Sequence, residues 1–210
     1  FDAVSFTSIP FSSGGELTLS DTRVTARFTH LTKPYAERRK VGESVLNAIK
    51  TMYRNDVEFE LRRNHRPLMQ NFSAQGHVWI DGSARIMPPK FSNGKDKVID
   101  ATVSIDLAQM NHYAVKCAEA FLVKLDRGDV AGVSRLDSDS RYWENYNTPR
   151  VKDDRFTEMR PAARALMGSF LADPELATLH KKALCIHKQK ASRLRSDTKW
   201  AEVVAEFRTS

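Results

Sequence analysis

Several features that would place this chain in a familiar class are missing from its sequence. Two cysteines in 210 residues, Cys117 and Cys185, are too few for a disulfide framework and favour a reducing compartment. No apolar run approaches the length of a membrane span, and no basic segment precedes an apolar one at the start, so no signal peptide is expected. With no internal repeat or low-complexity tract either, the composition is that of a soluble globular protein.

The chain also lacks a recognisable catalytic or metal-binding constellation. No serine, cysteine or carboxylate pattern suggests hydrolysis. His180, Cys185 and His187 are close together, but their spacing fits no standard zinc site and a helix would place them on different faces. The sequence therefore predicts no enzyme activity, no cofactor and no metal.

Positive charge is in excess. Lysine and arginine total 33 against 26 acidic residues, which gives a formal net charge of +7. Such an excess indicates a polyanionic partner, most commonly nucleic acid, although a purely solubilising role explains the charge equally well.

The most informative stretch spans residues 97–128. Residues 97–107 alternate apolar and polar side chains, as in a strand with one buried face. At Asn111 the period becomes helical, and Gly128 supplies a stop. The apolar stripe of this expected helix consists of Val115, Ala118, Leu122 and Leu125. Strand and helix each have an apolar face that must be covered.

The preceding residues predict further strands. Residues 3–9 and 16–19 indicate an opening hairpin around Gly14-Gly15, and residues 22–32 a strand with a basic, hydroxyl-rich exposed face. Residues 37–52 fit a helix or a strand. The other expected strands are residues 56–63 and 75–81.

The character of the chain changes beyond residue 135. Residues 137–148 are polar and predict a linker whose aromatic residues, Tyr142, Trp143 and Tyr146, either pin it to the preceding domain or stack on bases. Three helices are then expected at 161–171, 175–194 and 198–207, the second capped by Asp173-Pro174 and the third by Ser196-Asp197. We therefore divide the chain into a domain at 1–135 and a helical extension at 136–210.

This order of elements resembles the coat proteins of single-stranded RNA bacteriophages. The stretches SDTRVTARFTH, ERRKVGESVLNAIK and DVEFELRR look like three consecutive strands of that family, and RIMPP, KVIDATVSIDL and LDRGDVAG are similar to its last loop, last strand and C-terminal helices. The resemblance covers residues 1–135 and makes residues 40–49 a strand. It implies an α+β fold: an antiparallel sheet with an N-terminal hairpin and C-terminal helices, forming an intertwined dimer, here with a C-terminal helical extension.

The same resemblance implies function. Homodimers would assemble into an icosahedral capsid, or virus-like particle, that packages viral single-stranded RNA, and would repress replicase translation by binding an RNA hairpin; no membrane or small-molecule substrate would be involved. The protein would occur in the virion, and in the host bacterial cytoplasm during assembly. A partner chain would cover Val115, Ala118, Leu122 and Leu125. The side chains expected to meet RNA are Arg23, Thr25, Arg27, Lys40, Arg54, Arg62, Thr102 and Ser104.

The sequence departs from the coat-protein pattern in two respects, and two other functions remain as alternatives. The expected RNA face also carries acidic residues such as Glu58 and Asp100, and the extension could line the inside of a shell or decorate its outside. Tyr113 and Lys116 on a helix, with His65 upstream, also suggest an HUH-type rolling-circle replication endonuclease with a tyrosine nucleophile, although the second metal-binding histidine is missing. The other alternative is a viral matrix-type RNA-binding protein.

Overall fold

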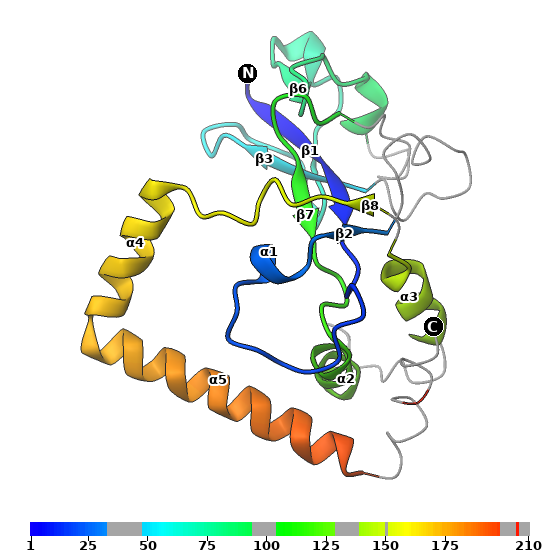
Figure 1. Cartoon of the computed structure of the whole chain (residues 1–210). Coiled ribbons are helices and arrows are strands. Elements are labelled where there is room, and N and C mark those ends of the chain that lie inside the picture. Colours follow the sequence, from blue (N-terminus) through cyan, green and yellow to red (C-terminus); the bar gives the residue numbers. More distant parts are fainter. Residues whose placement is uncertain (33–47, 94–103, 129–138, 150, 198–204, 206–210) are drawn as a thin grey trace. The chain divides into compact units, whose positions relative to one another are not determined.

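The computed structural model describes residues 1–32, 48–93, 104–128, 139–149, 151–197 and 205 (Figure 1). The chain is mixed α and β, with an open sheet, mostly antiparallel strand pairing and C-terminal helices. It divides into two compact units. Unit 1 comprises residues 1–10 and 33–112, and unit 2 comprises residues 11–32 and 113–210. These units differ from the division at residue 135, which itself falls outside the described residues.

The sheet of unit 1 is built around the first strand, β1 (Ala3–Pro10). Strand β3 (Ile49–Tyr53) pairs with it antiparallel, with Ser5 opposite Thr51. Two short strands run parallel to β1, namely β6 (Trp79–Asp81) along its first half and β7 (Met110–His112) along its second. The expectation of a wholly antiparallel sheet is therefore wrong for these two strands.

The core of unit 1 lies against this sheet and is rich in aromatic side chains. Phe72 stacks on Phe59, with ring centroids 5.9 Å apart, and meets Trp79 edge to face at 5.7 Å. Such pairs add to the stabilisation from apolar burial. The buried cluster is Ala3, Ile49, Val57, Phe59, Met69, Phe72, Trp79, Met87 and Phe91.

Short elements connect the core strands. They are β4 (Leu61–Arg62), β5 (Pro67–Leu68), and the 3₁₀ turns η3 (Ser73–Gln75) and η4 (Pro89–Phe91). Of the strand predicted at 56–63, only β4 forms, although Val57 and Phe59 are buried and Glu58 and Glu60 exposed as its alternation predicted. Of the strand predicted at 75–81, only β6 forms.

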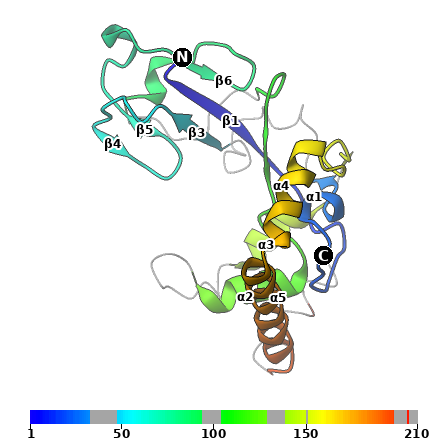
Figure 2. The same cartoon turned by 90° about the vertical axis from the view of Figure 1, so that its left-hand side faces the viewer.

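Unit 2 holds the helices (Figures 1 and 2). A two-stranded ladder joins β2 (His30–Leu31) to β8 (Val151–Lys152). The helices are α1 (Val24–Arg27), α2 (Ala118–Arg127), α3 (Asp139–Asn147), α4 (Pro161–Ala172) and α5 (Pro174–Arg195).

The last two helices confirm the sequence patterns. Helix α4 begins at Pro161 as expected, and the Asp173 carboxylate accepts hydrogen bonds from the backbone N–H groups of Glu175 and Leu176 at the start of α5, at 2.8 and 3.1 Å. Together with Pro174, this cap starts a new helix immediately after α4 ends. The helix predicted at 198–207 lies outside the described residues except for residue 205. Of its predicted cap, Ser196 instead ends α5.

Helix α2 begins later than predicted. Gly128 ends it with a positive φ of 77°, as expected, but Lys116 also has a positive φ of 59°, which interrupts a right-handed helix. The helix therefore begins at Ala118 rather than near Asn111, and residues 110–112 form β7. Of the strand predicted at 97–107, residues 97–103 lie outside the described residues and residues 104–107 are not a strand.

Three other predictions for unit 2 are wrong. Residues 16–19 form no hairpin with β1, because their backbone contacts α2: the N–H groups of Ala118 and Glu119 donate to the carbonyl oxygens of Glu16 and Leu17. Residues 22–32 form α1 and β2 rather than one strand. The expected linker at 137–148 contains α3. Of the strand predicted at 40–49, which belongs to unit 1, residues 40–47 lie outside the described residues and Ile49 begins β3.

Candidate functional site

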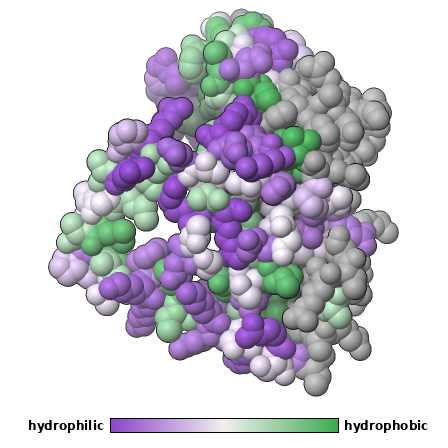
Figure 3. All heavy atoms as spheres, viewed as in Figure 1, coloured by the Kyte–Doolittle hydropathy of each residue, from purple (hydrophilic) through white to green (hydrophobic). Residues whose placement is uncertain are grey.

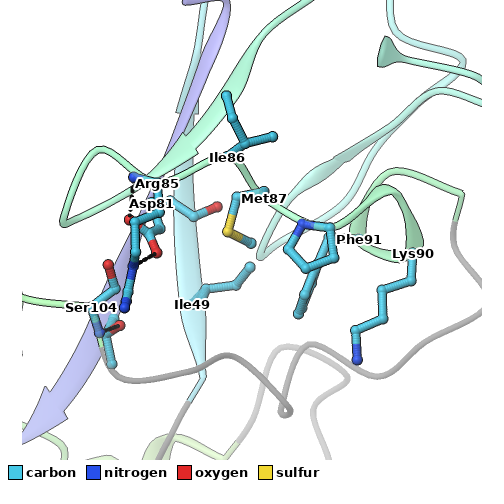
Figure 4. Close-up of a pocket in the computed structure, with 11 residues that line it drawn as sticks. Ile49, Asp81, Arg85, Ile86, Met87, Lys90, Phe91 and Ser104 are labelled. Atoms are coloured by element: carbon cyan, nitrogen blue, oxygen red, sulfur yellow. Dashed lines mark hydrogen bonds and ion pairs between the residues drawn. The ribbon is translucent and has the colours of Figure 1, made fainter. Parts of the chain in front are cut away.

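Unit 1 contains a half-polar cavity of about 300 Å³ beside the sheet (Figure 4). This volume is at the lower end of the range for ligand pockets. Its lining residues are Ser5, Thr7, Ile49, Asp81, Arg85, Ile86, Met87, Pro88, Lys90, Phe91 and Ser104.

Four segments of the sequence place these side chains. Strand β1 supplies Ser5 and Thr7 from its buried face, and β3 supplies Ile49. The chain then turns back on β6, with the N–H of Asp81 donating to the carbonyl oxygen of Arg85 at 2.9 Å. Turn η4 follows directly in the sequence and supplies Lys90 and Phe91.

Gly82 anchors the segment that carries Ser104. A Cβ atom at Gly82 would lie 2.4 Å from the carbonyl oxygens of both Ser104 and Ala108. The Gly82 carbonyl in turn accepts hydrogen bonds from Leu107 and Ala108, at 2.9 and 3.0 Å. Only glycine permits this approach, so the site's geometry depends on it.

A carboxylate with well-defined partners forms the polar end of the cavity. Asp81 accepts a hydrogen bond from the backbone N–H group of Ser83 at 2.9 Å. It also accepts from the backbone N–H group and the Nε of Arg85, both at 3.0 Å (Figure 4). Burial acts to raise the pKa of Asp81, but the Ser104 hydroxyl and these hydrogen bonds outweigh it, so the pKa lies below its usual value. The carboxylate is therefore ionised at neutral pH.

Three hydroxyl groups line the neighbouring wall. Ser5 Oγ is hydrogen-bonded to Thr51 Oγ1 at 2.7 Å and accepts from Trp79 Nε1 at 2.9 Å. The backbone N–H of Ser104 donates to Thr7 Oγ1 at 3.1 Å. The Ser104 Oγ is buried near Asp81 and helps to lower the pKa of that carboxyl group, although among the described residues it makes no hydrogen bond of normal geometry. A ligand could satisfy this hydroxyl.

The opposite wall is apolar and carries a cation. Met87 and Phe91 are buried, and the exposed Lys90 holds its Nζ 5.3 Å from the centroid of the Phe91 ring. The cavity can therefore bind a molecule with a flat or apolar body, a hydrogen-bonding edge and a negative charge near Lys90. Sequence analysis missed this set of residues, although the D-G turn and the P-P-K-F run were visible signals.

The residues predicted to bind RNA do not gather on one sheet face. Arg23, Thr25 and Arg27 belong to unit 2, in and around α1, because the strand that was to align them does not form. Unit 1 contains three others, Arg54, Arg62 and Ser104, of which Ser104 lies in the cavity. The remaining two, Lys40 and Thr102, lie outside the described residues.

Several of these cations are already engaged. Arg27 forms an ion pair with Glu16 and its side chain is only 10% exposed. Arg54 forms one with Asp56, which lowers the pKa of that carboxyl group. Arg23 donates to the Thr157 carbonyl at 2.8 Å. Their predicted RNA contacts would require these pairs to open.

The residues predicted as a dimer interface are already covered by their own chain. Val115, Ala118, Leu122 and Leu125 are buried within unit 2. Aromatic side chains of α3 pack beside them: Phe121 lies 5.2 Å from Trp143 and 5.9 Å from Tyr142, ring centroid to centroid. The stripe thus has a cover without a second copy, while the dimer itself stays a prediction. Tyr142 and Trp143 pack on Phe121 of α2, and Tyr146 packs on Tyr142.

The endonuclease interpretation loses its geometric basis. Tyr113 precedes α2 rather than lying on it, and its ring packs against Phe11 at 5.0 Å. His65 Nδ1 lies 3.0 Å from the Ile49 carbonyl oxygen, as a structural contact. His180, Cys185 and His187 are exposed on α5. Among the described residues, no three metal-binding side chains come together as a site.

A second basic feature emerges on α5. Lys188, Lys190 and Arg195 pair with Asp21, Asp126 and Glu119, at 2.7, 2.7 and 2.5 Å. Three further cations are exposed, and no acidic residue in the described ranges forms an ion pair with them. They are Lys181, Lys182 and Arg193.

Comparisons with models of protein families, with curated proteins and with solved structures gave no match. No helix in the described part of the chain is both long and apolar enough to cross a membrane.

Proposed function

We propose that this protein is the coat protein of a single-stranded RNA bacteriophage, which binds viral RNA and assembles as dimers into an icosahedral shell. In this proposal the chain catalyses no reaction, and it represses replicase translation by holding an RNA hairpin. The observation that supports it most directly is the half-polar cavity of unit 1, because its chemistry suits one unpaired nucleotide.

The shape and chemistry of the cavity suit a base that is splayed out of a single strand rather than a base within a duplex. Proteins read RNA sequence mainly at unpaired bases, which need a flat apolar wall and hydrogen-bonding groups at their edges. Met87 and Phe91 form such a wall, and Ser104 Oγ and the Asp81 carboxylate lie opposite. Lys90 at the mouth suits the phosphate, which fixes position but carries no sequence information.

The unpaired cations of α5 support the same function in a different way. Lys181, Lys182 and Arg193 can neutralise phosphates without regard to sequence, as packaging of a long RNA requires. The cavity would then select particular RNA sequences, and α5 would supply affinity for RNA of any sequence.

Expression of the full chain alone tests the proposal. We expect particles by electron microscopy that contain nuclease-protected RNA. Lys90→Ala should weaken hairpin binding about tenfold, because one phosphate contact is lost, whereas Lys152→Ala, at a lysine paired with Asp154, should leave it unchanged. A small, RNA-free protein with no affinity for single-stranded RNA would contradict the proposal.

A further inference from the structure

Helix α4 is apolar around most of its circumference and yet uncovered. Its twelve residues carry a single charged side chain, Arg164, and every one of them is exposed. A helix of this composition is normally buried. Figure 3 shows its hydrophobic side chains gathered at the left of that view. Within the described part of unit 2, nothing covers α4, so its apolar surface is open to a partner.

The first half of α5 also carries exposed apolar side chains. Leu166 and Phe170 lie one turn apart on α4, and Leu176 and Leu179 lie about one turn apart on α5 after the Asp173 cap. Only the far end of α5 is covered, where Leu194 is buried and α5 packs on α2. We call this surface the arm face. Its large side chains, each 40–55% exposed, are Leu166, Met167, Phe170, Leu171, Leu176, Leu179 and Ile186.

We propose that the arm face is covered by the arm face of a second copy of this chain. The seven large side chains leave on the order of 600 Å² of apolar surface per copy, close to the roughly 800 Å² that one partner contributes to a standard interface. With one charge in twelve residues, α4 offers no electrostatic complementarity to a charged partner but is compatible with itself. This deepens the proposed function by naming a contact between subunits, although the association itself requires no RNA.

Sedimentation of the full chain tests the proposal, after nuclease treatment and in high salt so that RNA cannot bridge copies. The wild type should sediment at twice the 23.8 kDa chain mass or more. Leu166→Glu with Phe170→Glu should raise the dissociation constant at least about 100-fold, because both side chains would be buried at the interface. Met52→Glu with Leu107→Glu, at two exposed apolar positions of unit 1, should not change it.

Circular dichroism separates association from folding. Leu166→Glu with Phe170→Glu should leave the helix content unchanged, since both side chains are exposed on α4. A wild type that remains monomeric at all concentrations, or charge variants that associate normally, would overturn the proposal. A monomer that binds lipid vesicles through α4 would assign the arm face to a membrane surface and overturn it equally.

The two proposals can fail separately. Particles with protected RNA that persist in the Leu166→Glu, Phe170→Glu variant would refute the arm contact and leave the coat function standing. Dimers that depend on the arm face but have no affinity for RNA would refute the coat function and leave the arm contact standing.

Discussion

Arg195 at the end of α5 donates a hydrogen bond to Glu119 in the first turn of α2, across 2.5 Å. The other carboxylate oxygen of Glu119 accepts from the backbone N–H of Leu19, at 2.7 Å. One carboxylate thus joins three segments of unit 2 that are far apart in the sequence. Lys190, paired with Asp126, reinforces the contact one turn earlier on α5.

Glu119→Ala should therefore destabilise unit 2. The substitution removes charge-assisted hydrogen bonds from a side chain that is 15% exposed, at a cost of about 1.5–3 kcal/mol. Urea unfolding followed by tryptophan fluorescence would measure this change, since Trp143 is buried against α2. Glu58→Ala, at an exposed carboxylate of unit 1, is the control, and an equal loss there would show that the joint at Glu119 contributes nothing specific.

Two glycine substitutions should act in opposite directions. Gly82→Ala would place a Cβ atom 2.4 Å from two carbonyl oxygens and force residues 104–108 away from the cavity, which should cost about 1–3 kcal/mol. Gly168→Ala, which meets nothing, should instead stabilise α4 by about 0.5–1 kcal/mol. Thermal unfolding at a concentration low enough to keep the chain monomeric would compare them. A Gly82→Ala variant as stable as the wild type would contradict this account of Gly82.

Elements governed by local signals were predicted well from the sequence. Helices α4 and α5 follow from apolar periodicity, the Asp173 cap and Pro174, all within a few residues of each other. The stop at Gly128 is equally local. Alternation also identified the buried Val57 and Phe59, although alternation alone did not make their segment a strand.

Elements that depend on partners far away in the sequence were predicted poorly. Residues 22–32 alternate as a strand should, but among the described residues only His30 and Leu31 pair, with the two residues of β8, more than 100 positions away, and through a single bridge to Phe11. The start of α2 was misplaced because the residue with left-handed backbone conformation there is Lys116, and a lysine, unlike a glycine, does not indicate that conformation in the sequence. The cavity was missed for a similar reason, since β1, the turn at Gly82 and Ser104 come together only through long-range pairing.

The stability of unit 1 should depend on pH through Asp81. Because its folded pKa lies below the unfolded value near 3.8, ionised Asp81 stabilises the fold above that unfolded pKa, and this contribution is lost as the pH falls through the folded pKa. Asp81→Asn should thus cost about 1–2 kcal/mol at pH 7, and this cost should decrease as the pH falls below 3.8. Unfolding measured over a series of pH values would show the difference narrowing on acidification. A difference that stayed constant would mean that the charge of Asp81 is not what stabilises the turn.

RNA binding should depend on salt through the unpaired cations of α5. Each cation that neutralises a phosphate of a single strand contributes about 0.7 to the slope of log binding constant against log salt concentration. Replacing Lys181, Lys182 and Arg193 by alanine should therefore reduce the magnitude of that slope by about 2. Because these side chains form no ion pairs within the described ranges, their removal should leave the fold intact. Replacing Lys188 and Lys190, which are engaged by Asp21 and Asp126, should change the slope less, since those lysines must first give up a carboxylate. Equal slopes for the wild type and the triple variant would mean that RNA binds another surface. In that case α5 would serve only the contact between copies of the chain.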